Sequence, residues 1–140
     1  MNNPALCMHV SQRNQLKFVA KTSTGIAIIA EPTPMLGGSG TYPNPLEYFI
    51  ASLGMCAAIK VQIDLAKMDN PPESIAVMIE YSRKPTPPEV LEDIHLTFTL
   101  TGNLDNQNVT GAIHEVMTCY CPVAVMVSSA AHVTWEHRIL

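Results

Sequence analysis

Cysteines are the residues of this chain that are best suited to covalent chemistry. The sequence of 140 residues contains four of them, Cys7, Cys56, Cys119 and Cys121. A cysteine thiolate is both a nucleophile and a metal ligand. Zinc sites usually combine Cys-x-x-Cys pairs or close His partners, but the only close pair here has one residue between its cysteines. We therefore expect no metal site and no cofactor.

The same cysteines do not form the pattern of a structural disulfide framework. The first eight residues have neither the basic start nor the apolar segment of a secretory signal. The sequence therefore predicts a cytoplasmic protein, and structural disulfides are rare in that compartment. A cysteine can also serve as a small buried hydrophobe, which is the interpretation that we prefer for Cys7.

Local sequence distinguishes Cys121 from Cys56. Cys121 directly precedes Pro122, the expected first residue of a helix. The partial positive charge and the free N–H groups at a helix N-terminus stabilise a thiolate. Cys56 lies in an uncharged helical stretch, and burial raises the pKa of a thiol and makes it inert. From the residues alone, Cys121 is the better functional candidate, and Cys56 fits a core position unless another element supplies a cation or a hydrogen-bond donor.

The helix expected to position Cys56 covers residues 44–68. Asn44 is a suitable N-cap, Pro45 suits the first helical position, and Glu47 completes a capping box. No charged residue occurs between Glu47 and Lys60. A helix without charge on any face is normally buried on nearly every side.

The other expected elements surround this helix in the sequence. Alternating or short apolar runs predict strands, and apolar residues at helical spacing predict two more helices. Strands followed by helices without βαβ units indicate one α+β domain, residues 1–140, with a mostly antiparallel sheet. The expected strands cover residues 17–21, 26–30, 75–81, 94–101 and 133–139, and the expected helices cover residues 105–118 and 122–130.

Composition limits the classes of partner. Hydrophobic residues make up 47% and charged residues 14% of the chain, against roughly 25% charged in an average domain. A short chain with so many apolar residues is expected to cover part of its apolar surface with a partner subunit. Eight scattered Lys and Arg and a net charge of −4 give no basic stripe for nucleic acid. The longest uncharged stretch, residues 116–135, is interrupted by polar residues, so we expect no membrane span.

Several short motifs in fixed order resemble the OsmC/Ohr family of thiol-dependent peroxidases. The likeness covers about residues 16–138 and includes the separations of 12 residues from Asn44 to Cys56 and 65 residues from Cys56 to Cys121. The motifs are Asn44-Pro45-Leu46-Glu47, then Ala51, Gly54 and Cys56, then Cys121-Pro122-Val123, and finally His132-Val133-Thr134.

This resemblance implies an intertwined α+β homodimer whose antiparallel sheets wrap around a central long helix. It further implies a redox-active pair and an oxidoreductase of the oxidative stress response. Cys56 would be the peroxidatic cysteine that becomes a sulfenic acid. This reverses the preference for Cys121 over Cys56 that the local sequence indicated. Cys121 would resolve it as a Cys56–Cys121 disulfide, and a cellular dithiol would reduce that disulfide.

The family also uses an arginine and a glutamate to activate its nucleophile. The nearest matches here are Arg13 and Glu47, and Glu47 stands one position later than the acid of the best-characterised branch. Such a shift turns a side chain by roughly 100° around a helix. As alternatives, Glu47 serves only in the capping box and Arg13 is an exposed charge.

Three functions follow as hypotheses. The first is a peroxidase for organic hydroperoxides, with an apolar pocket for the substrate tail. The second is a slower thiol redox protein or sensor, and the third is a non-catalytic dimer that binds an apolar small molecule. The candidate pocket walls are Phe49, Leu53, Met55 and Met126.

Overall fold

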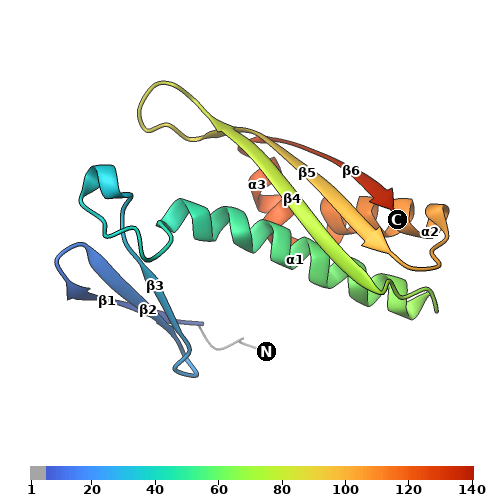
Figure 1. The fold of residues 1–140 in the computed structure, drawn as a ribbon, viewed down its shortest axis with the longest axis horizontal. Coiled ribbons are helices and arrows are strands. Elements are labelled where there is room, and N and C mark those ends of the chain that lie inside the picture. The colour runs from blue at the N-terminus through green and yellow to red at the C-terminus, as the bar shows by residue number, and fades with distance from the viewer. Residues whose placement is uncertain (1–5) are drawn as a thin grey trace. The chain divides into compact units, whose positions relative to one another are not determined.

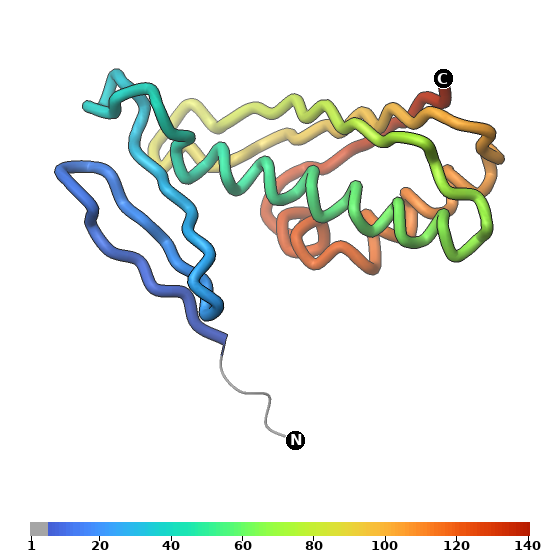
Figure 2. The backbone as a smooth tube through the Cα atoms, turned by 60° about the horizontal axis from the view of Figure 1, so that its bottom comes forward, coloured from blue at the N-terminus to red at the C-terminus, as the bar shows by residue number. Residues whose placement is uncertain are grey.

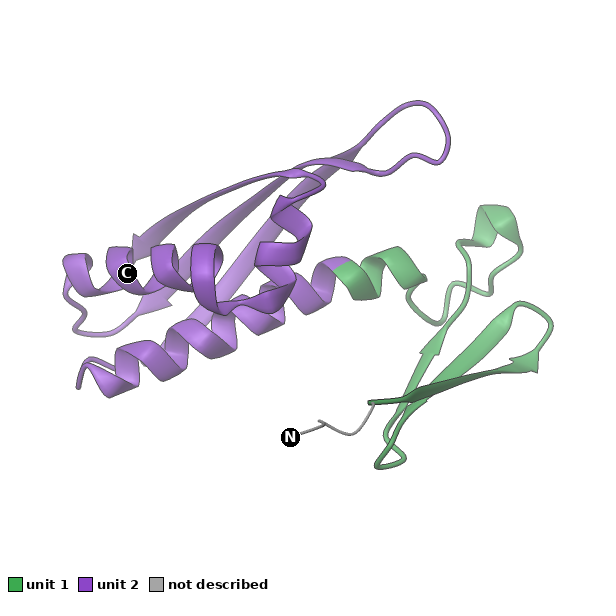
Figure 3. Cartoon of the chain, turned by 180° about the vertical axis from the view of Figure 1, so that it is seen from behind, with its two compact units in different colours: residues 1–49 green, residues 50–140 purple. Residues whose placement is uncertain are grey.

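The computed structural model describes residues 6–140 as an α+β chain, which confirms the expected fold class (Figure 1). The chain divides into two compact units, residues 1–49 and residues 50–140 (Figure 3). The elements are β1 (Met8–Asn14), β2 (Lys17–Thr22), β3 (Ala27–Ala30), a 3₁₀ turn (Pro34–Leu36), α1 (Pro45–Lys67), β4 (Ser74–Arg83), β5 (Leu91–Thr101), α2 (Asn106–Glu115), a π-helix (Val116–Tyr120), α3 (Pro122–Ser128) and β6 (His132–Ile139).

The first unit contains an antiparallel sheet in the order β1–β2–β3. None of the residues in these three strands is fully buried in the single chain. Among the described residues of this unit, the apolar side chains of the sheet therefore remain exposed, which is a surface that soluble proteins normally cover. The exposed apolar side chains of this unit include Val10, Phe18, Ile26 and Ile28.

A buried carboxylate fixes the Gly-rich loop that follows this sheet. Glu31 Oε1 accepts hydrogen bonds from the Ser39 hydroxyl at 2.5 Å and from the N–H groups of Thr41 and Tyr42 at 3.0 and 3.3 Å. These donors, the Ser39 hydroxyl above all, lower the pKa of Glu31 to about 2. Gly38 is required in this loop, since a Cβ there would lie 1.7 Å from the carbonyl oxygen of Pro32. The loop therefore has a structural anchor and no features of a phosphate-binding turn.

The second unit is built on a sheet in the order β4–β5–β6. The expected alternation is confirmed, with Ile94, Leu96, Phe98 and Leu100 of β5 almost completely buried. The part of α1 from Ile50 onward, α2 and α3 all lie on one face of this sheet (Figure 2). Their apolar side chains and the inner face of the sheet form one core.

Two local features of this unit differ from simple expectation. β4 and β5 are antiparallel, but β5 and β6 are parallel. The expected helix over residues 105–118 ends as α2 at Glu115 and continues as the π-helix, in which the Cys121 N–H donates to the Val116 carbonyl at 2.8 Å. Hydrogen bonds between residues five positions apart depend on tertiary packing, which cannot be predicted from the spacing of apolar residues in the sequence.

Helix α1 confirms the strongest element predicted from the sequence, 44–68 expected against Pro45–Lys67 observed. The Glu47 N–H donates to Asn44 Oδ1 at 2.9 Å, and Glu47 Oε1 accepts from the Asn44 N–H at 3.2 Å, which is a capping box. By length and composition alone α1 could cross a membrane. Its inner face, at Leu53, Ala57, Val61 and Leu65, is fully buried, as in a core helix.

The outer face of α1 is not buried within the single chain, unlike the expectation of burial on nearly every side. Met55 is 58% exposed and Ile59 is 60% exposed, and Ile63 continues the same line one turn later. We call these three residues the α1 stripe. An apolar row of this kind on a long helix is a surface that another protein chain normally covers.

Candidate functional site

The two cysteines of the expected redox pair lie together in the second unit. Cys121 is 0% exposed and belongs to the core, and the half-buried Cys56 packs against the same core cluster. The two side chains are near enough for Cys56 to raise the pKa of the Cys121 thiol. Both thiols are free. The fold therefore brings together two cysteines that are 65 residues apart.

Different elements position the two sulfur atoms. Cys56 projects from the middle of α1, whereas Cys121 connects the π-helix to α3 and is the N-cap of α3. The Ala124 N–H donates to Cys121 Sγ at 3.4 Å. The Val116–Cys121 hydrogen bond and the proline at the first position of α3 fix the backbone on both sides of Cys121.

Burial determines the protonation of Cys121. It raises the pKa of the Cys121 thiol, and the neighbouring Cys56 raises it further. The N–H groups of Ala124 and Val123 lower the Cys121 pKa, as expected at a helix N-terminus, but their effect is smaller than that of burial. Cys121 therefore rests as a protonated thiol, which suits the second thiol of a redox pair better than the first.

Glu47 is engaged at the N-terminus of α1. Besides the capping box, its Oε1 accepts a hydrogen bond from the Asn44 side-chain amide at 2.6 Å. Cys56 stands nine positions after Glu47 on the same helix, a rise of about 13.5 Å. The structure thus places Glu47 in a capping role and does not bring its carboxylate to Cys56.

A pair of substitutions separates capping from catalysis at Glu47. We expect Glu47→Ala to lower the free energy of unfolding by about 1 kcal/mol through loss of the cap. Glu47→Gln keeps the capping geometry, so its stability should stay near that of the parent chain. Both variants should react with hydroperoxide at Cys56 at an unchanged rate. Denaturant unfolding and the rate of Cys56 oxidation measure the two effects, and slower oxidation in a stable Glu47→Gln variant would show the activating role that the resemblance implies.

Arg13 lies in the first unit, at an irregularity of β1 between Gln12 and Asn14. It is exposed, and among the described residues it forms no ion pair. Its role as an activator of Cys56 stays a prediction of the family resemblance. The same oxidation assay on Arg13→Ala tests it.

An apolar groove of about 290 Å³ runs between α1 and β4. Gly54 allows the two elements to approach closely, since a Cβ there would lie 2.7 Å from Ile79 Cδ1. Met55 lines this groove, whereas Leu53 is fully buried core and Phe49 and Met126 are exposed. The groove is lined by Ala51, Gly54, Met55, Ala58, Val77 and Ile79.

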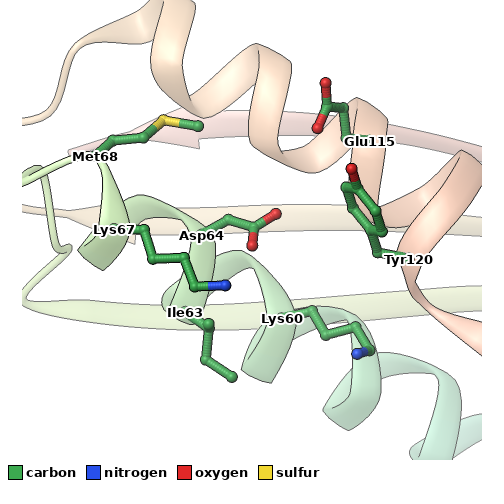
Figure 4. A pocket seen from close by; sticks show the side chains of 7 residues that line it. All are labelled: Lys60, Ile63, Asp64, Lys67, Met68, Glu115 and Tyr120. Atoms are coloured by element: carbon green, nitrogen blue, oxygen red, sulfur yellow. The ribbon is translucent and has the colours of Figure 1, made fainter.

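A second, more polar pocket lies further along α1 (Figure 4). Lys60 stands one helical turn after Cys56, so the two side chains are neighbours on one helix face. Lys60 was not among the site residues predicted from the sequence, although its spacing of four residues from Cys56 could have indicated it. The pocket is lined by Lys60, Ile63, Asp64, Lys67, Met68, Glu115 and Tyr120.

Comparison with known proteins gives a consistent result for sequence and fold. Residues 38–136 match the family model described as OsmC-like protein. The chain is 28% identical to the protein YhfA of Escherichia coli strain K12 over 127 residues, which are 89% of this chain and 91% of YhfA.

Two solved structures illustrate the fold. An OsmC-like protein from Mycoplasma pneumoniae has a TM-score of 0.81 at 12% identity, with 99% of each chain covered. The organic hydroperoxide resistance protein OsmC from Legionella pneumophila has a TM-score of 0.70 at 18% identity, with 98% of each chain covered. At these identities the two structures are evidence for the fold.

Proposed function

Because the chain belongs to the OsmC-like protein family, we propose that it is a cysteine-based peroxidase that reduces organic hydroperoxides. In this reaction the Cys56 thiolate attacks one peroxide oxygen, the O–O bond breaks, and the departing alkoxide takes up a proton to become an alcohol. Cys56 is left as a sulfenic acid. The sulfur of Cys121 then displaces water from Cys56, and the Cys56–Cys121 disulfide forms.

The proximity of Cys56 to the buried Cys121, with Cys56 packed against the core cluster that contains Cys121 and near enough to raise its pKa, is the observation that carries this proposal. A sulfenic acid in a cell must be captured before it is oxidised further, and a thiol held against it can do so without diffusion. Cys121 must lose its proton to attack, and the N–H groups of Ala124 and Val123 favour its thiolate form. The same donors favour Cys121 as the leaving thiolate when the disulfide is later reduced.

The apolar groove supports an organic substrate. Its residues Ala51 and Met55 belong to α1 and stand five positions and one position before Cys56 in the chain. An alkyl or aryl group in this groove would lose contact with water and gain roughly 25 cal/mol for each Å² that it buries. Hydrogen peroxide has no such group, so the groove favours bulky hydroperoxides.

We also propose that the active protein is a homodimer in the cytoplasm. The exposed apolar side chains of the sheet in the first unit, and Ile59 and Ile63 of the α1 stripe in the second, are surfaces that a second copy would cover. A disulfide that forms and is reduced in each cycle needs a reducing compartment and a thiol reductant, which the family resemblance gives as a dithiol.

Peroxide turnover with two substrates tests the proposed function. With dithiothreitol as reductant, we expect cumene hydroperoxide to be consumed with a kcat/KM at least about tenfold above that for hydrogen peroxide, because only the organic substrate fills the groove. Equal, slow rates with both peroxides would instead indicate a thiol redox protein. If Cys56 is not oxidised at all, the remaining hypothesis is a non-catalytic dimer that binds an apolar small molecule.

A further inference from the structure

The burial of the Cys56–Cys121 pair limits the approach of a reductant. Cys121 is 0% exposed and Cys56 is half-buried. Ile59 follows Cys56 by three positions, so the two are neighbours on the helix surface, and Ile59 belongs to the surface that a second copy would cover. A hydroperoxide brings one oxygen atom to Cys56, whereas a dithiol must bring two sulfur atoms to the disulfide in turn. Direct reduction is therefore more hindered than oxidation.

Cys119 is a free and exposed thiol that lies close to this pair in the chain. A single residue, Tyr120, separates it from Cys121. The Cα atoms of residues two positions apart are at most about 7 Å apart, even in a fully extended chain. A disulfide needs a Cα–Cα separation of roughly 4.4–6.8 Å. The chain itself therefore keeps Cys119 near the range in which it can form a disulfide with Cys121.

The segment that carries Cys119 lies at the boundary between surface and core. Residues 118–120 are exposed, whereas Cys121 is buried. Cys119 Sγ lies 3.5 Å from Thr118 Oγ1, and the Cys119 thiol is the donor because the Thr118 hydroxyl itself donates to the His114 carbonyl at 2.7 Å. These bonds are local to the π-helix, which ends at Tyr120 with Cys121 as its C-cap. Single π-turns are frequent at functional sites, and rotation of this last turn would bring the Cys119 sulfur to Cys121.

We propose that Cys119 is a third redox residue, which transfers the disulfide from the buried pair to the surface. The inference rests on the proposed function and adds a step between formation and reduction of the disulfide. Cys119 gives its proton to water, its thiolate attacks Cys121 Sγ, and Cys56 leaves as a thiolate. A dithiol then attacks Cys119 Sγ, Cys121 leaves as a thiolate that takes up a proton, and the second sulfur of the dithiol displaces Cys119. The dithiol supplies both electrons and ends as a disulfide.

Ring size determines which of the two disulfides predominates. A disulfide across one intervening residue closes a small ring and departs from the preferred disulfide geometry, and strained disulfides are the more easily reduced ones. The oxidised protein should therefore be mainly the Cys56–Cys121 form, with Cys119–Cys121 as the minor and more reactive species. When a dithiol attacks that species at Cys119, the Ala124 N–H that donates to Cys121 Sγ stabilises the departing thiolate.

Reduction is measured on a Cys56–Cys121 disulfide formed with diamide, with dithiothreitol as the dithiol. We expect Cys119→Ser to be reduced at least about tenfold more slowly than the parent chain, because only direct attack on the buried pair remains. Cys7→Ser removes another exposed cysteine and is the matched control, which should be reduced at the parent rate. Oxidation of Cys56 by one equivalent of cumene hydroperoxide should be unchanged in Cys119→Ser, a result that a merely structural role would not give. Equal reduction rates in Cys119→Ser and the parent chain would overturn the proposal.

A second measurement needs no variant and locates the sulfur that the reductant attacks. The oxidised parent chain is mixed with 2-mercaptoethanol, whose single thiol leaves a mixed disulfide, and the reaction is stopped with acid before mass spectrometry. We expect the adduct on Cys119, with Cys56 and Cys121 recovered as thiols. An adduct on Cys56 would overturn the proposal. Because diamide forms the disulfide, failure of the peroxidase function would appear separately, as a lack of Cys56 oxidation by hydroperoxide.

Discussion

Replacing Cys56 by serine should abolish hydroperoxide turnover, with a loss of at least about 1,000-fold in kcat/KM, equivalent to roughly 4 kcal/mol. A serine hydroxyl cannot be oxidised to a sulfenic acid, so the first step has no nucleophile. Replacing Cys121 should give a different phenotype. Cys121→Ser should consume about one equivalent of hydroperoxide and then stop, because the sulfenic acid at Cys56 has no resolving thiol.

Cys7 is exposed, so the buried position preferred for it from the sequence is wrong. It supplies the matched control for both variants, and Cys7→Ser should turn over normally. Mass spectrometry after trapping with a sulfenic-acid reagent identifies the state of Cys56 in the Cys121→Ser protein. Similar, modest losses in Cys56→Ser and Cys121→Ser would contradict the assignment of a peroxidatic and a resolving cysteine.

A charge within the α1 stripe should prevent assembly. We expect the parent chain to be a homodimer whose interface buries more than about 2,000 Å² in total. Ile59 is at the centre of the stripe, and a glutamate there would bury an unpaired charge against the second copy. Ile59→Glu should therefore be monomeric or unfolded at micromolar concentration, as measured by light scattering and circular dichroism.

Leu140→Glu is the control for this change, because it places the same charge at another exposed apolar residue, at the end of the chain. This variant should stay dimeric. A parent chain that is a folded monomer at micromolar concentration would refute the proposed assembly.

The sequence was most informative where local rules act alone. Asn44, Pro45 and Glu47 predicted the start of α1 because a capping box needs only neighbouring residues, and both of its reciprocal hydrogen bonds are present. Alternation predicted the buried face of β5 for a similar reason, since the side-chain period of a strand is two. Pro122 marked the first residue of α3.

Features that depend on tertiary contacts could not be predicted in this way. Periodicity placed Cys56 in the core and gave no sign that Cys121 would lie against it, so that pairing entered only through the family resemblance. The prediction of a thiolate at Cys121 rested on the helix N-terminus alone. Burial, which the local sequence does not show, raises the pKa of Cys121 more than the N-terminal N–H groups lower it. The parallel pairing of β5 and β6 and the π-helix likewise depend on how distant segments pack.

Peptide mapping after oxidation tests the central claim most directly. The reduced protein is treated with one equivalent of an organic hydroperoxide, the remaining thiols are alkylated, and the disulfide is located by mass spectrometry. The account predicts an intramolecular Cys56–Cys121 bond, with Cys7 and Cys119 alkylated. A disulfide between Cys56 and Cys119 with Cys121 alkylated, or Cys56 recovered as a free thiol, would contradict it.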